Sequence, residues 1–269
     1  MKAKSTEILE SIYHRGQEKI WDGREVLKML LEKHDGICDM SPRQSEALQN
    51  IFSVILEGEH AAWKVSLQLA DKLENIEAKL AATSQAHDES RHFYVMRDYL
   101  NLAGIRPVTV PVPVRQALDM VISTDSLPKK LLGMQLMVEP VALTIFQEVR
   151  RVSPEPVLAE LLEYFERDEA RHVALGVHHL PVAVKEMGPL QIISLVLWQL
   201  RIFMLELQGL RELSDDFSAL GLNAEDVFDL AERKQLSALQ DFVIELGLSP
   251  KVWDPIRHLI RYQKRWMLK

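Results

Sequence analysis

Two short stretches, HDESRH at His87–His92 and RDEARH at Arg167–His172, contain the same motif, D-E-x-R-H. The first copy begins at Asp88 and the second at Asp168. Residues three positions apart lie on the same face of a helix, so each motif presents a Glu and a His together. A single Glu-x-x-His pair is common on exposed helices. Two copies in one chain instead predict two related halves that meet at one site.

The separation of the two motifs identifies the carboxylates that would complete a metal site. Two Glu-x-x-His pairs leave two metal ions short of ligands, and in four-helix carboxylate sites each of the other two helices supplies one Glu. Glu59 and Glu139 are separated by the same number of positions as the two motifs, and each precedes its motif Glu by an equal step. The neighbouring Glu57 fails this test, because it maps onto Met137. The predicted metal ligands are therefore Glu59, Glu89, His92, Glu139, Glu169 and His172.

Helix length and turn signals support this ligand set. The pattern predicts long helices at 42–73, 76–103, 127–151 and 155–184, with a turn near Asn75 and a second within Ser153–Pro156. In each helical hairpin the turn lies midway between the single Glu and the motif. The arms are about 15 residues, or roughly 22 Å, so the ligands would meet in the middle of the bundle.

The other letters of the motif predict supporting hydrogen bonds. A ligating His usually donates its second ring N–H to a carboxylate. Asp88 is placed to reach His172 across a two-fold bundle, and Asp168 to reach His92. Two arginines of the motifs, Arg91 and Arg171, would pair with these aspartates.

The rest of the chain is also predicted to be helical. One or two short helices precede residue 40, and further helices are expected at 189–213, 224–246 and 249–267. The proline-rich stretch at 105–114 is interpreted as an extended connection, because proline cannot donate a backbone hydrogen bond. We expect a single helical domain at 1–269, with a metal-binding bundle at 42–184 and a C-terminal extension at 189–269. The basic last helix is expected to pack on the bundle, with a partner-binding or membrane-surface role as the minority interpretation.

Composition restricts the protein class. A net charge of −7 argues against nonspecific nucleic-acid binding, and the single Cys38 cannot form an internal disulfide. The N-terminus lacks the apolar region of an export signal. The most apolar run, at 187–200, is shorter than the roughly 20 residues that a membrane span needs. These features predict a cytoplasmic protein without a transmembrane segment, and a homodimer is the default expectation.

The paired DESRH and DEARH motifs with Glu59 and Glu139 resemble those of the ferritin-like di-iron carboxylate proteins. Within that superfamily they are similar to the bacterial multicomponent hydroxylases, the acyl-carrier-protein desaturases and the ribonucleotide reductase small subunits. The resemblance covers about residues 42–184 and implies an all-α, ferritin-like four-helix bundle with a dinuclear metal site. The radical tyrosine of the reductases would lie at the position of Met96, so stored-radical chemistry is not expected.

The resemblance implies two iron ions, with a mixed manganese–iron pair or two manganese ions as alternatives. It also implies reaction with O₂ and a possible electron-donor protein. Residues one turn from a ligand are candidates to line a pocket for a small apolar, aromatic or acyl substrate, although most such residues are ordinary core. These candidates are Leu56, Trp63, Gln135, Leu136, Leu143, Phe165 and Glu166, and for Glu166 a surface salt bridge is favoured over a ligand or proton-relay role.

Three functional hypotheses remain open from the sequence. The first is a di-iron oxidase or oxygenase acting on an organic substrate. The second is a ferroxidase-type protein that binds and oxidises iron without turning over an organic compound. In the third, the carboxylates only form salt bridges with Arg91, Arg171 and their neighbours within a structural bundle.

Overall fold

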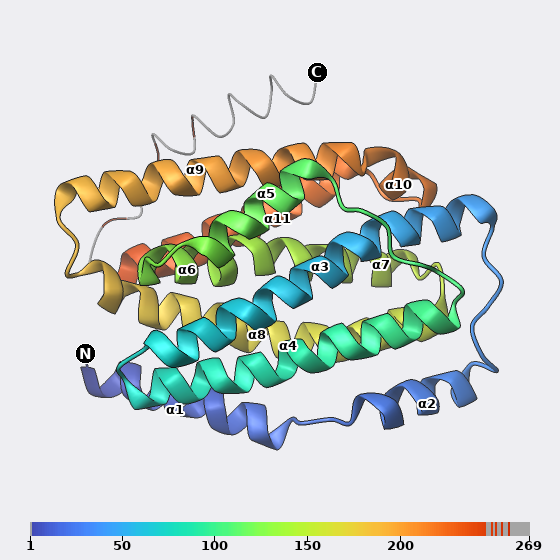
Figure 1. Ribbon diagram of the computed structural model, residues 1–269, viewed down its shortest axis with the longest axis horizontal. Helices are drawn as coiled ribbons and strands as arrows, with labels where there is room; N and C mark the ends of the chain where they lie inside the picture. Colours follow the sequence, from blue (N-terminus) through green and yellow to red (C-terminus); the bar gives the residue numbers. More distant parts are fainter. Residues whose placement is uncertain (1, 246–248, 250, 252–253, 255–257, 259–269) are drawn as a thin grey trace.

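The computed structural model describes residues 2–245, 249, 251, 254 and 258, and every long element within them is a helix. Four helices form the central bundle (Figure 1): α3 (Pro42–Lys72), α4 (Ile76–Leu102), α7 (Glu139–Val152) and α8 (Pro156–Val184). Consecutive members pair as the hairpins α3–α4 and α7–α8, and α4 also packs against α8. The predicted all-α four-helix bundle is confirmed within the described residues.

The two hairpin turns lie where the sequence predicts them. Ser41 and Gln44 form a capping box at the start of α3, and the Asn75 side chain accepts a hydrogen bond from the backbone N–H of Ala78 to begin α4. Ser153 ends α7 in the left-handed conformation with a φ of 45°. The Glu155 side chain then caps α8 by accepting from the N–H of Leu158.

The helix predicted at 127–151 is interrupted. It consists of α6 (Leu127–Gly133), a π-helical turn η1 (Met134–Val138) and α7. Pro140 stands at the start of α7 and has no N–H to donate to a carbonyl one turn earlier, which favours a local departure from α-helical bonding. The wider turn ends directly at Glu139, so it sets the direction in which that carboxylate leaves the helix.

The connection predicted at 105–114 is only partly extended. A helix, α5 (Val112–Ser123), begins within it, with Pro111 as the N-cap and Pro113 in the first turn. Proline is well tolerated in a first helical turn because the N–H there has no partner in any case. The sequence interpretation took these prolines as the mark of an extended connection, whereas two of them stand at the start of a helix that packs against α3 and α9.

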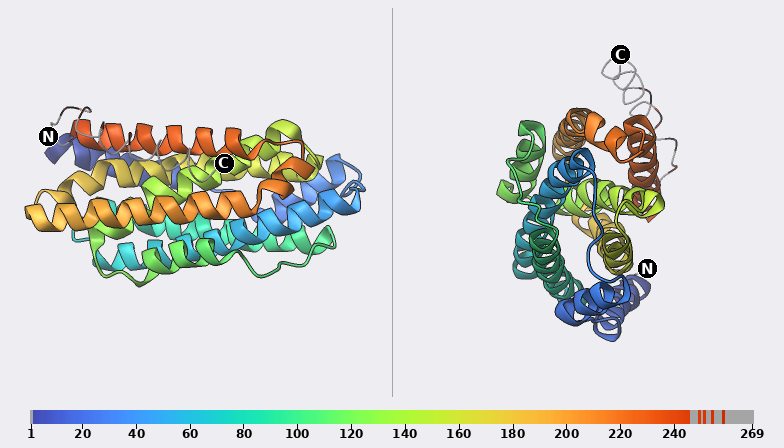
Figure 2. Two further views of the ribbon diagram at one scale, coloured as in Figure 1. Left: turned by 90° about the horizontal axis from the view of Figure 1, so that it is seen from above. Right: turned by 90° about the vertical axis from the view of Figure 1, so that its right-hand side faces the viewer.

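The remaining helices cover two sides of the bundle (Figures 1 and 2). One side is covered by α1 (Lys2–Glu18) and α2 (Gly23–Lys33), which contact α4 and α8. On the other side, α9 (Pro189–Glu212) contacts α5 and α6, and α11 (Ala224–Glu245) contacts α7 and α8. A short α10 (Ser214–Ala219) that the sequence did not predict joins them. The helix predicted at 249–267 lies almost wholly outside the described residues.

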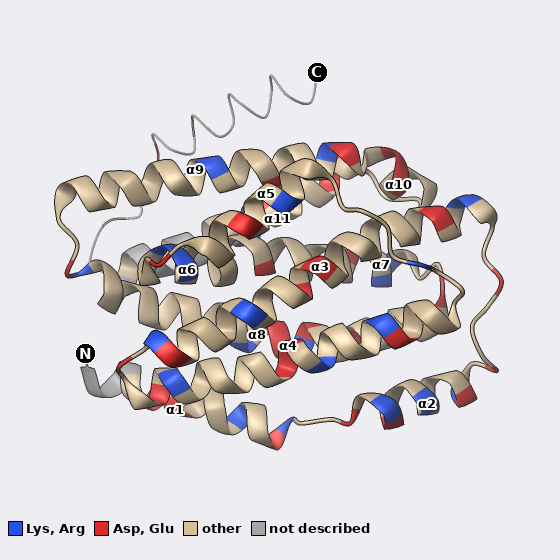
Figure 3. Cartoon of the chain, in the orientation of Figure 1, with Lys and Arg blue, Asp and Glu red and all other residues tan. Residues whose placement is uncertain are grey.

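Helix α9 carries few charges (Figure 3). It is the one helix of the described chain that is long and apolar enough to cross a membrane, with an 18-residue window of mean hydropathy 1.6, of which 33% is buried. Core helices of soluble proteins meet the same criterion of length and composition, so this observation carries little weight. Leu190, Ile193 and Leu197 on α9 are exposed.

Candidate metal centre

The six predicted ligands come together from the four bundle helices. Each of them is at most 4% exposed, although all are ionisable. They form two groups in which the potential donor atoms lie within 4.8 Å of one another. One group contains Glu59 and His92, the other contains Glu139 and His172, and both groups share Glu89 and Glu169.

The shared glutamates each face both histidines. Glu89 places Oε1 2.9 Å from the Nδ1 of His172 and Oε2 3.5 Å from the Nδ1 of His92. Glu169 places Oε1 3.4 Å from the Nδ1 of His92 and Oε2 3.3 Å from the Nδ1 of His172. The remaining carboxylate of the first group, Glu59, lies 3.3 Å from the Nδ1 of His92. Each of the two groups would therefore offer a cation one imidazole, one glutamate of its own and the two glutamates that both groups share.

The far side of each histidine contacts the aspartate of the other motif. The Nε2 of His92 lies 3.2 Å from the Oδ2 of Asp168, and the Nε2 of His172 lies 3.3 Å from the Oδ2 of Asp88. Both motif arginines connect the two aspartates, because each of them donates to Asp88 and to Asp168. The resulting network fixes both imidazoles with Nδ1 toward the carboxylates.

Burial and neighbouring charges shift the protonation of these groups. Burial raises the pKa of Glu59 and of Glu139 well above the usual range for a carboxyl. Burial alone would also raise the pKa of Glu89, but the charge and hydrogen bonds of the two histidines outweigh it and lower that pKa. For His92 and His172, burial opposes charging, yet the surrounding carboxylates raise both imidazole pKa values well above normal.

The residues present fit a pair of divalent cations. The Oε2 atoms of Glu89 and Glu139 are buried without a hydrogen-bond partner among the described residues. Facing carboxylates in a buried site carry a large free-energy cost unless cations compensate their charge. The donor set consists of oxygen and imidazole nitrogen, with no thiolate, which suits iron or manganese.

Two residues that the sequence analysis did not identify also belong to the site. Gln85 donates from Nε2 to the Oε1 of Glu139 at 2.5 Å and to the Oε1 of Glu89 at 3.2 Å. Its position one turn before Glu89 was an available signal. The indole N–H of Trp21, between α1 and α2, donates to the Oδ2 of Asp168 at 2.9 Å. Trp21 gave no signal, because only tertiary packing brings that segment to the motif.

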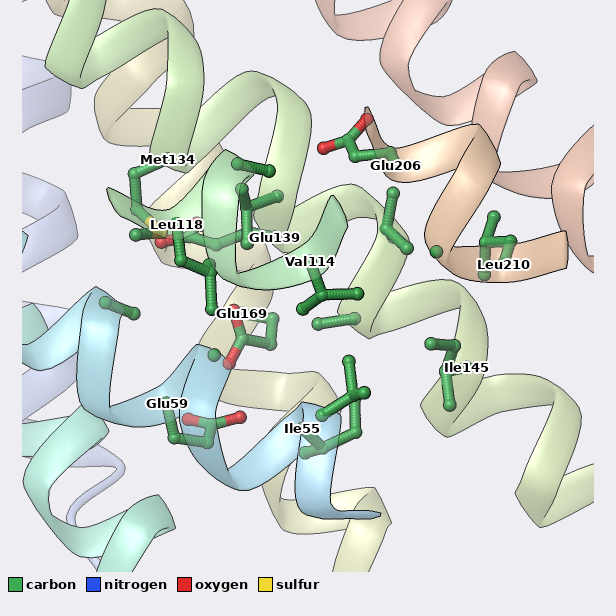
Figure 4. A pocket seen from close by; sticks show the side chains of 18 of the residues that line it. Ile55, Glu59, Val114, Leu118, Met134, Glu139, Ile145, Glu169, Glu206 and Leu210 are labelled. Carbon is green, nitrogen blue, oxygen red and sulfur yellow. The ribbon is translucent and has the colours of Figure 1, made fainter. Parts of the chain in front are cut away.

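An apolar pocket reaches the carboxylates (Figure 4). Its cavity volume is about 80 Å³, and it lies between α3, α5, α7 and α9. At one end Glu59, Glu139 and Glu169 line it, and Glu206 of α9 lies at another edge. Most of the remaining lining is aliphatic and includes Ile55, Val114, Leu118, Ile145 and Leu210.

None of the residues predicted to line a pocket lines this one. Trp63 lies in an aromatic cluster with His60 and Phe93, and Glu166 forms a salt bridge with Arg150 at 2.9 Å, the interpretation favoured for it. Phe165 stacks on His92, and Gln135 donates to Gln85. Part of the wall of this pocket comes from α5 and α9, which the sequence analysis did not consider as neighbours of the ligands.

Solved structures with a similar fold are known. No family model matches the chain, and no curated protein matches it. Among solved structures, a protein from Bacillus halodurans assigned as a class I ribonucleotide reductase matches with a TM-score of 0.68, 15% identity and coverage of 96% of this chain and 99% of that chain. The R2-like ligand-binding oxidase from Sulfolobus acidocaldarius matches with a TM-score of 0.66, 17% identity and coverage of 91% and 93%. The chain has the ferritin-like fold of the R2-like oxidases.

A variant of an R2-like ligand-binding oxidase with a Mn/Fe cofactor matches to a similar degree, with a TM-score of 0.66, 15% identity and coverage of 90% and 93%. These identities are low, so the ferritin-like similarity establishes the arrangement of the helices. Chemistry has to be argued from the site itself.

Proposed function

We propose that this protein is an O₂-dependent dinuclear-metal oxidase or oxygenase that acts on a small apolar, aromatic or acyl substrate. The observation that carries the proposal is the apolar pocket that ends at the buried glutamates. A structural salt-bridge cluster has no need of such an opening. Two iron ions, or a manganese–iron pair, would supply the electrons that reduce O₂.

The residues of this chain would hold and shield that chemistry. Glu89 and Glu169 would bridge the two ions, while Glu59 with His92 and Glu139 with His172 would complete the two positions. The aliphatic wall would exclude water from one side of the ions and orient an apolar substrate toward them. The side of the histidines that faces away from the pocket is closed by the aspartate–arginine network.

A ferroxidase that oxidises iron without an organic substrate is the second candidate. It uses the same ligands, and the buried carboxylates favour it as much as the first candidate. The pocket favours the oxygenase, because an iron-handling protein needs a polar path for ions rather than an aliphatic one. A cytoplasmic location, an electron-donor protein and a homodimer remain parts of the proposal.

Metal analysis tests the centre first. After anaerobic loading with Fe(II), we expect about two ions per chain and rapid O₂ consumption on exposure to air. The double variant Glu89→Ala/Glu169→Ala removes both bridging carboxylates and should lose the metal and the O₂ consumption together. A double variant of the exposed Glu212 and Glu186, each changed to Ala, serves as the matched control. If the wild-type protein binds no metal after loading, the proposed metal centre is wrong and the carboxylates only form salt bridges within a structural bundle.

Metal binding is also expected to release protons. The raised pKa values of Glu59, Glu139, His92 and His172 favour their protonated forms in the metal-free protein, and a metal ion displaces protons from its ligands. Loading should release about one proton or more per ion, and the apparent affinity should increase from pH 6 to pH 8. A pH indicator in weak buffer measures the release, and Glu89→Ala/Glu169→Ala should show none. Binding that is independent of pH would contradict the assignment.

A further inference from the structure

The two halves of the centre differ at three positions next to the ligands. Under the repeat that relates Glu59 to Glu139, Gln85 corresponds to Phe165 and Gln135 corresponds to Ile55. Gly176 corresponds to Met96. Each exchange places a polar or small residue on one side of the pseudo-two-fold and a bulky apolar residue on the other.

On the Glu139 side, these residues form a continuous hydrogen-bonded chain. A Cβ at Gly176 would lie 2.6 Å from the Cβ of Gln135, so the glycine makes the room that Gln135 occupies. The Nε2 of Gln135 then donates to the Oε1 of Gln85 at 3.3 Å. With its amide oxygen engaged, Gln85 directs its Nε2 to Glu139 and Glu89.

The Glu59 side has an apolar counterpart of this chain. Phe165 stacks on the imidazole of His92 with a centroid distance of 4.2 Å and an interplanar angle of 15°. Ile55 and Met96 are buried at the positions that correspond to Gln135 and Gly176. No side-chain amide donates to Glu59 within the part of the chain that the structure describes.

This difference changes the ligands themselves. A hydrogen bond into a carboxylate oxygen withdraws negative charge that would otherwise attract a cation, and a metal ion at the Glu139–His172 position has to share that oxygen with Gln85. Glu59 receives no such amide hydrogen bond from the described residues, so neither of its oxygens would have to be shared with an amide when a metal ion binds. The two positions therefore differ in affinity although their ligand types are the same.

We propose that Gln85, held by Gln135 in the space that Gly176 leaves, makes the two metal positions unequal, so that the Glu59–His92 position fills before the Glu139–His172 position. This inference rests on the metal centre of the proposed function. A hydrogen bond to a charged group corresponds to a difference of about tenfold or more in affinity. Gln85 is a positioning residue here, because it acts through Glu139.

Calorimetric titration of the metal-free protein with Mn(II) tests the order. Wild type should bind in two steps whose dissociation constants differ by about tenfold or more. Glu139→Gln should keep one ion with the tight affinity, and Glu59→Gln should keep one ion with the weak affinity. Two equal steps in wild type, or the opposite assignment from these two variants, would overturn the inference.

Gln85→Leu then tests the cause. Removing the amide should tighten the second step and bring the two constants to within about threefold of each other. Gln17→Leu on α1, where the side chain is exposed, is the matched control and should keep the wild-type ratio. If Gln85→Leu fails to fold, Gln135→Leu removes the support of Gln85 and should narrow the ratio less. If a folded Gln85→Leu variant keeps the wild-type ratio of the two dissociation constants, the role of Gln85 is wrong but the metal centre is unaffected. If the wild-type protein binds neither Mn(II) nor Fe(II), both proposals are wrong.

Discussion

Replacing Asp168 with alanine should lower the free energy of unfolding of the metal-free protein by about 3–5 kcal/mol. Asp168 is fully buried and accepts hydrogen bonds from Trp21, Arg91 and Arg171, and it also contacts the Nε2 of His92. Its removal leaves buried cationic and polar donors with too few acceptors. Such uncompensated groups cost more than the lost pairwise attraction.

Urea unfolding, with and without the substitution, measures this effect. Asp98→Ala is the matched control, because the Asp98 side chain is 37% exposed and lies 3.4 Å from Arg97, and it should change stability by less than about 0.5 kcal/mol. Trp21→Phe removes one of the donors to Asp168 and should cost about 1 kcal/mol. An Asp168→Ala variant as stable as Asp98→Ala would mean that the network does not hold the centre together.

The free energy of unfolding should depend on pH through the buried carboxyl of Glu206. Burial raises the pKa of Glu206 to about 8. A hydrogen bond from Gln235 to its Oε2 lowers this pKa but is outweighed by the burial. Its Oε1 is buried and has no partner among the described residues. The carboxyl is therefore neutral in the folded protein at pH 7, whereas it is ionised in the unfolded chain.

The sign of the pH dependence follows from linkage. A group whose pKa is raised on folding contributes stability that is complete below its unfolded pKa, near 4.5, and that is lost as the pH rises to about 8. Wild type should lose about 4 kcal/mol from this group between pH 5 and pH 9. Glu206→Gln cannot ionise, so its stability should fall less over the same range.

The difference between the two proteins isolates Glu206, because the other titrating groups are common to both. Urea unfolding at pH 5, 7 and 9 gives this difference, and the variant should gain on wild type at each step. Glu212→Gln, at an exposed position of the same helix, should follow wild type. Parallel curves for wild type and Glu206→Gln would show that the carboxyl titrates normally.

The repeated motif was sufficient to predict the residues that meet in the centre. Helical periodicity places Glu89 with His92 and Glu169 with His172 on single faces, and the constant separation of the two halves selects Glu59 and Glu139. The turn residues Asn75 and Ser153 define hairpins short enough to bring these positions to one level. These features are local, or repeat at a fixed spacing, and can therefore be derived without a structure.

The pocket and the asymmetry of the centre required the tertiary structure. The π-helical turn before Glu139 depends on how Pro140 is accommodated between packed helices, and the helix α5 depends on prolines that can either start or stop a helix. Trp21, in the connection between α1 and α2, and Glu206 of α9 reach the site from segments far away in the sequence. The sequence alone determined the fold class and the candidate ligands, because helical spacing and the repeat are properties of the chain itself. Tertiary structure decided which ligand Gln85 contacts and where the pocket opens, because those depend on the packing of segments that carry no common pattern.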